Sequence, residues 1–113
     1  MLFRSVRDRI AAMQREMLGD LSPLQASELS NRAVALLGYV MVEEREAELA
    51  YLKVLDAALD SQEAANRAKV RAQASEEYAR YRTAKDARVL VLEMSRTLKA
   101  FARASAEEFK ATV

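Results

Sequence analysis

The chain has 113 residues, of which 18 are Lys or Arg and 17 are Asp or Glu, and it contains neither Cys nor His. The absence of Cys excludes disulfides and thiol chemistry, and the absence of His removes the commonest metal ligand and the usual acid/base group at neutral pH. The length indicates one domain with a modest core. Because Gly and Pro are scarce and no strand-like alternation occurs, we expect an all-α fold.

The predicted architecture is a short N-terminal helix followed by a long antiparallel helical hairpin, which oligomerises through apolar helix faces. We expect residues 1–113 to form a single helical domain, with helices over about 1–18, 23–60 and 64–110. No apolar run approaches the roughly 20 residues that span a bilayer, and no apolar signal-peptide core opens the chain. These features predict a cytoplasmic protein without a membrane partner.

The first predicted helix is amphipathic, because apolar residues recur at spacings of three and four from Phe3 to Met17. We expect it to dock on the main body or on a neighbouring subunit; its arginines leave a membrane-surface or targeting role as the alternative. Gly19 can close this helix in the left-handed conformation. Ser22, Pro23 and Gln25 then predict a capping box at the start of the next helix.

The helix expected over 23–60 carries a seam of alternating three and four spacing, typical of helix pairing. The seam consists of Leu29, Ala33, Leu36, Val40, Ala47, Ala50, Val54 and Ala57. Asp60, Ser61 and Asn66 are candidate caps at the turn, which we expect near residue 65. The apolar runs 39–42 and 89–92 exceed what a helix pair can bury, so they predict further partners, most simply identical subunits.

Charge is segregated along the chain. Residues 21–60 carry three basic and seven acidic groups, a net charge of −4, whereas residues 61–113 carry eleven basic and seven acidic groups, a net charge of +4. On a helical projection eight basic residues of the last predicted helix share one sector of about 120°, whereas Lys69 and Arg80 lie outside it. The eight are Arg67, Arg71, Arg82, Lys85, Arg88, Arg96, Lys99 and Arg103, with Tyr78 and Tyr81 between them.

A basic row of this kind can neutralise phosphates, and the tyrosine rings can stack on unpaired bases. The row therefore predicts binding of single-stranded nucleic acid without sequence preference. The alternative is a solvated face, or one paired with acidic residues of the other arm through Glu43, Glu46, Asp56 and Asp60.

No pattern of catalytic residues, phosphate loop or metal-ligand spacing occurs in the sequence, so we expect no enzyme activity, no metal and no cofactor. Glu44 and Glu48 lie one turn apart in the apolar sector. A carboxylate metal site in a helical bundle would also need His ligands. We therefore expect these glutamates to form an ion pair at the edge of the core or across a subunit boundary, for example with Arg80 or Arg88.

Several stretches resemble the phage UvsY-type recombination mediators: residues 13–17, 19–25, 47–53, 84–87 and 89–101. The resemblance implies a ring-forming helical protein of the phage-infected bacterial cytoplasm. Such a protein binds single-stranded DNA and helps to load a RecA-type recombinase where single-strand-binding protein is in the way. The family's DNA-contacting positions around the hairpin correspond here to Lys53, Arg67 and Arg71.

The leading hypothesis is thus a homo-oligomeric, single-stranded DNA-binding recombination mediator. A structural or assembly protein, such as a virion component or ring adaptor whose basic row is a subunit contact, explains the apolar surfaces equally well. A third reading is a helical protein whose basic face binds an acidic protein.

Overall fold

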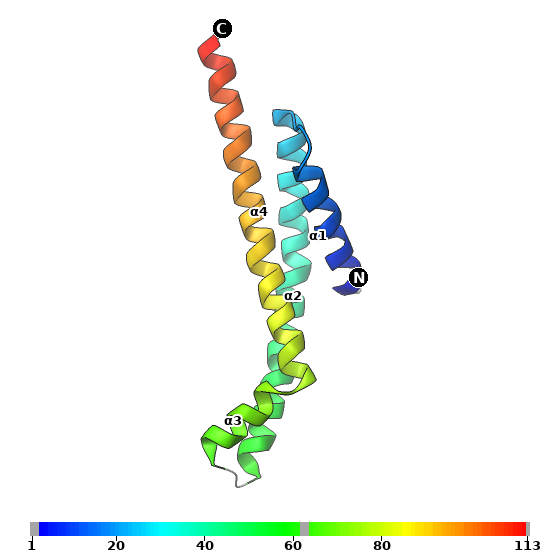
Figure 1. Ribbon diagram of the computed structural model, residues 1–113, viewed down its shortest axis with the longest axis vertical. Coiled ribbons are helices and arrows are strands. Elements are labelled where there is room, and N and C mark those ends of the chain that lie inside the picture. The colour runs from blue at the N-terminus through cyan, green and yellow to red at the C-terminus, as the bar shows by residue number, and fades with distance from the viewer. Residues whose placement is uncertain (1–2, 62–63, 113) are drawn as a thin grey trace. The chain divides into compact units, whose positions relative to one another are not determined.

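The computed structural model describes residues 3–61 and 64–112, apart from the side chains of residues 109 and 112. All secondary structure in these ranges is helical (Figure 1). The helices are α1 (Phe3–Met17), α2 (Pro23–Asp60), α3 (Ala65–Gln73) and α4 (Glu76–Thr112). The all-α prediction is confirmed. The chain forms two compact units, Met1–Tyr39 with Val89–Val113 and, separately, Val40–Arg88.

Helix α2 starts where the sequence predicts, because a capping box closes its first turn. The Ser22 N–H donates to Gln25 Oε1 at 2.9 Å, and the Gln25 N–H donates to Ser22 Oγ at 3.1 Å. The expectation for Gly19 is wrong: its φ lies outside the left-handed region. Instead, the Gly19 N–H donates to the Glu16 carbonyl at 3.2 Å and closes α1 in a tight turn, which does not require positive φ.

In the first unit, α1 lies beside the first part of α2 (Figure 1). The predicted apolar face of α1 is buried at Val6, Ile10 and Met13. The unit also contains α2 up to Tyr39 and α4 from Val89 onward. Their buried apolar residues are Ala26, Leu29, Ala33, Leu36, Val91, Met94 and Leu98. This burial confirms that α1 docks on the body of its own chain, which spaced apolar residues on one helix face favour.

In the second unit, α2 and α4 run antiparallel. Glu44 on α2 pairs with Arg88 on α4, and Tyr51 further along α2 contacts Tyr78 earlier on α4. The core contains Val40, Ala47, Tyr51, Ala58, Ala68, Ala72 and Ala84. The buried face of α2 differs from the predicted seam near the end of the helix. Ala57 of the predicted seam is exposed, whereas Tyr51 and Ala58, which are not part of it, are buried.

The helix predicted over 64–110 is two helices, because the chain breaks at Ala74 and Ser75. The Ser75 hydroxyl donates to the Ala72 carbonyl at 2.5 Å and accepts the Tyr78 N–H at 3.2 Å. Ser75 thus ends α3 and caps α4 with one side chain.

Ser61 ends α2 in a similar way, since its hydroxyl donates to the Ala58 carbonyl at 2.6 Å. Asn66 does not cap α3, whose N-cap position is Ala64 and has no side-chain cap hydrogen bond. Part of the predicted turn, residues 62 and 63, lies outside the described residues.

The two apolar runs are only partly covered. Val40 and Val91 are buried, whereas Met41, Val42 and Leu90 are exposed. A Cβ added at Gly38 would meet no described atom within 4 Å, so Gly38 makes no close backbone approach inside the chain. Large apolar side chains therefore remain on the surface of the protomer.

Candidate nucleic-acid interface

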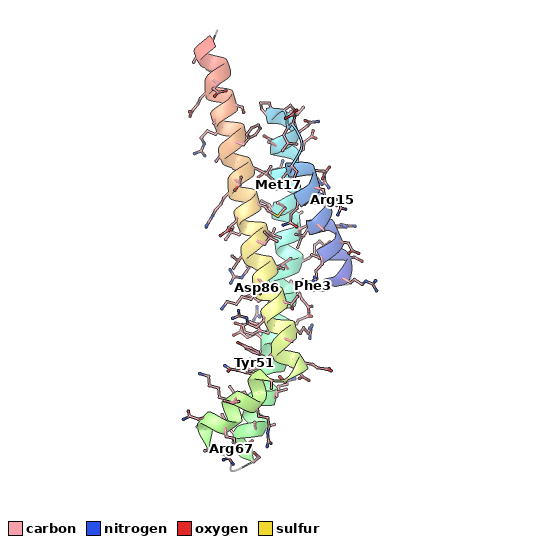
Figure 2. The ribbon with its side chains drawn as sticks, viewed as in Figure 1. Phe3, Arg15, Met17, Tyr51, Arg67 and Asp86 are labelled. Carbon is pink, nitrogen blue, oxygen red and sulfur yellow. The ribbon has the colours of Figure 1, made fainter. Side chains whose placement is uncertain are left out.

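The predicted basic residues lie on more than one helix. Arg67 and Arg71 are exposed on α3 (Figure 2 labels Arg67), so the single sector predicted for one helix does not include them. Lys53 is exposed near the end of α2. The remaining six lie on α4, with Arg82, Lys85 and Arg88 in the second unit and Arg96, Lys99 and Arg103 in the first.

Tyr78 and Tyr81 form a ring cluster with Tyr51 (labelled in Figure 2). Tyr51 and Tyr81 are nearly parallel, with centroids 6.0 Å apart, and the centroids of Tyr51 and Tyr78 are 4.9 Å apart. Burial in this cluster, with the nearby charges of Glu48 and Glu44, raises the pKa of the Tyr81 hydroxyl. One ring face of Tyr81 is therefore occupied within the protein and is not available to a base.

Two arginines of α4 form ion pairs with α2 in the second unit. The Arg88 guanidinium donates to the Glu44 carboxylate, whose side chain is 15 % exposed. This is the core-edge ion pair expected for Glu44. Arg80 binds Glu43 through two hydrogen bonds of 2.6 and 3.0 Å and lies 3.8 Å from Glu46. The hydrogen bond with Glu43 raises the pKa of Arg80.

Other cations are open to a ligand. Arg82 is exposed, Lys85 is half-buried, and neither forms an ion pair within the described residues. The same holds on the other unit for Arg96, Lys99 and Arg103, all exposed on one face of α4. Spacings of three and four residues place these last three cations along about 10 Å of helix axis.

Lys99 and Arg103 border a pocket of about 230 Å³. Ser27, Ser30 and Asn31 of α2 line its other side, together with Ala102. Ser30 is only 3 % exposed, and its hydroxyl has no hydrogen-bond partner among the residues that the structure describes. Two cations beside hydroxyl and amide donors form an environment suited to an oxyanion such as a phosphate.

The α2 side of this pocket is not predicted from the sequence. The sequence does contain a pattern that could have indicated it, since the polar residues Ser27, Ser30 and Asn31 recur at helical spacing. Polar residues at such spacing are also typical of a solvated helix face, so only the packing of α2 beside α4 in this unit identifies the site.

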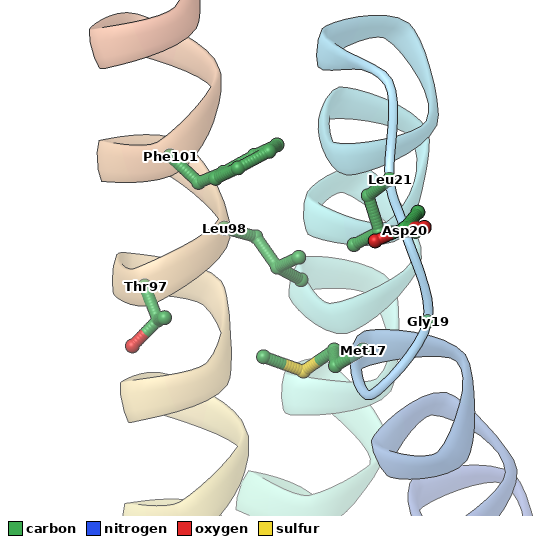
Figure 3. A pocket seen from close by; sticks show the side chains of 7 residues that line it. All are labelled: Met17, Gly19, Asp20, Leu21, Thr97, Leu98 and Phe101. Atoms are coloured by element: carbon green, nitrogen blue, oxygen red, sulfur yellow. The ribbon is translucent and has the colours of Figure 1, made fainter.

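A second pocket, of about 270 Å³, has a different character (Figure 3). Met17, Leu21, Leu98 and Phe101 give it an apolar lining, and Asp20 and Thr97 lie at its edge. No cation lines it, so it offers nothing to a polyanion.

No described group of three or more acidic residues is arranged to hold a metal ion. No helix in the described ranges is long and apolar enough to cross a membrane. Comparison with protein-family models, curated proteins and solved structures gives no match. The resemblance to the recombination mediators therefore stays a prediction.

Proposed function

We propose that this protein binds single-stranded DNA through its phosphates. The proposal rests on three members of the predicted basic row that lie on the first unit, Arg96, Lys99 and Arg103. We call these three the cationic row. Lys99 and Arg103 border the polar pocket that contains the unsatisfied Ser30 hydroxyl. Cations without acidic partners can release counterions from a nucleic acid without first breaking an internal ion pair.

The proposed contacts favour a single strand and no particular sequence. One row on one helix face can follow one phosphate backbone, and long flexible cations carry no base-reading pattern by themselves. Arg82, Lys85, Arg67, Arg71 and Lys53 would extend the phosphate contacts on the second unit. Tyr78 and Tyr81 would offer bases only the ring surface turned away from Tyr51.

Arg88 has a different role in this proposal. Its guanidinium binds a half-buried carboxylate of the same unit, and a phosphate would have to displace that partner. We therefore assign Arg88 to the stability of the fold and place the phosphate contacts of this part of α4 on Arg82 and Lys85.

The narrower proposal is that the protein is a homo-oligomeric recombination mediator that loads a RecA-type recombinase in the presence of single-strand-binding protein. Its support is the sequence resemblance, together with the exposed apolar side chains that a homo-oligomer would cover.

The test is fluorescence anisotropy with a labelled single-stranded oligonucleotide and its duplex at several salt concentrations. If all three cations of the row contact phosphates, they contribute about −2 to the slope of log affinity against log salt. The variant R96E/K99E/R103E should bind at least about tenfold more weakly than the wild type. Absence of binding at low salt would reject the proposal.

A matched control is R4E/R7E/R15E, which makes the same change in net charge on exposed arginines of α1 in the same unit. We expect it to keep most of the wild-type affinity, because α1 carries no part of the row. An equal loss in both variants would show that only net charge matters, and the site assignment would be wrong.

The alternative function is a structural or assembly protein. The observation that favours it is the exposed apolar surface of α2, which includes Met41, Val42, Leu49, Leu52 and Leu59. Under that function the basic row becomes buried between subunits, and polynucleotide has no effect on the assembly.

A further inference from the structure

One face of α2 in the second unit is left largely uncovered by the described residues. Val42, Leu49, Leu52 and Leu59 are 44–58 % exposed. With Arg45 and Asp56, also exposed, they follow alternating spacings of three and four residues. That spacing is the seam of a two-helix contact. This seam is separate from the one through Val40 and Ala47 that α2 buries within the unit.

The seam is symmetric about its centre. Counting outward from the midpoint between Ala50 and Tyr51, Leu49 corresponds to Leu52, Arg45 to Asp56 and Val42 to Leu59. Apolar residues match apolar residues, and the one cation matches the one anion. A two-fold axis at this midpoint would place each residue opposite its counterpart on a second, antiparallel copy.

We propose that residues 42–59 of α2 pair with the same segment of a second copy of this chain, antiparallel and about a two-fold axis. Arg45 then faces the partner subunit's Asp56, and each leucine at the centre packs on a leucine. Neither Arg45 nor Asp56 forms an ion pair within the described part of its own chain, so both are available.

Charge decides between the two orientations. A parallel pair in register would place Arg45 beside the partner's Arg45 and Asp56 beside the partner's Asp56, which are repulsive contacts inside a seam. The antiparallel pair replaces both with attractions.

This inference deepens the homo-oligomer of the proposed function but does not depend on nucleic-acid binding. An isologous contact closes at two copies, so a larger ring would need a second contact. Because the contact uses one helical segment of each copy, residues 42–59, we expect reversible dimerisation that depends on protein concentration.

The first test is sedimentation equilibrium of the full chain without nucleic acid. The protomer mass is 12.7 kDa, and we expect a monomer–dimer equilibrium. R45D and D56R each place like charges opposite one another and should weaken dimerisation at least tenfold. The exchange R45D/D56R restores the pairing and should return the dimerisation constant to within about threefold of the wild type.

R82D is the matched control, because it makes the same chemical change at an exposed arginine of the same unit outside the seam. It should leave dimerisation unchanged. A wild type that stays monomeric, single variants that dimerise normally, or a charge exchange that fails to rescue would each overturn the proposal.

Disulfide cross-linking tests orientation, since the chain has no native Cys. Mixed L49C and L52C proteins should cross-link to each other far more than either does alone. A V42C and L52C mixture should not cross-link efficiently, because these positions fall at different levels of the seam. Preferential cross-linking of L49C to itself would indicate a parallel pair and overturn the antiparallel proposal.

Discussion

At the scale of single residues, the basic side chains of α4 divide by their surroundings. Arg88 faces a carboxylate that is largely withdrawn from water, whereas Arg82 projects into solvent. A helical projection assigns both to one sector because it records direction around the axis and not the partner on the facing helix. Removing the two arginines should therefore have different consequences.

The variant R88A should lower the free energy of unfolding by about 1–3 kcal/mol, because it leaves the Glu44 carboxylate half-buried without its charged donor. R82A, an exposed substitution on the same helix, should change stability by less than about 0.5 kcal/mol. Urea unfolding followed by circular dichroism, at one protein concentration, measures both. Equal effects of the two variants would contradict the structural role of Arg88.

At the scale of elements, the sequence is informative where several local signals agree. The start of α2 combines a capping box, a proline in the first turn and an apolar seam, and its predicted bounds match Pro23–Asp60. The break between α3 and α4 has one signal, Ser75, which can cap a helix or lie inside one. No Gly or Pro accompanies it, so the break follows from how the short α3 packs through Ala68 and Ala72.

Replacement of Ser75 tests this account of the break. S75A removes the acceptor for the Tyr78 N–H and should lower the free energy of unfolding by about 1 kcal/mol. S75D keeps an acceptor at the same position, beside the positive end of the α4 dipole, but cannot donate to the Ala72 carbonyl, so its stability should lie between those of S75A and the wild type. Thermal and urea unfolding measure the difference. If S75A were as stable as S75D, the hydroxyl would not be what holds the start of α4.

At the scale of the whole molecule, the sequence predicts the helix content and the hairpin but not the partners of individual charges. Whether Arg80, Arg82 or Arg88 forms an ion pair depends on which residue of α2 lies opposite it. That depends on the register of the antiparallel helices, which the packing of Tyr51 on Tyr78 and Tyr81 defines. The polar pocket beside Lys99 likewise needs two segments that are far apart in the chain. The fold class can be predicted from the periodicity of apolar residues in the sequence. The site cannot, because it depends on how α2 and α4 are aligned along each other.

The two proposals together make a prediction that neither makes alone. A dimer carries two cationic rows, so a strand long enough to reach both should bind more tightly than a short one through effective concentration, without new contacts. R45D and D56R should both lose this advantage and bind a long oligonucleotide about tenfold more weakly, while their affinity for a short one changes little.

The result for D56R is the decisive one. This variant adds positive charge, so a purely electrostatic effect would raise its affinity for DNA at every oligonucleotide length. A loss confined to long strands can arise only if the second row has been removed with the second copy. Anisotropy with short and long oligonucleotides, with R45D/D56R as the restored dimer, separates these outcomes. If D56R bound the long strand as tightly as the wild type, the two copies would not share one strand, and each protomer would bind DNA by itself.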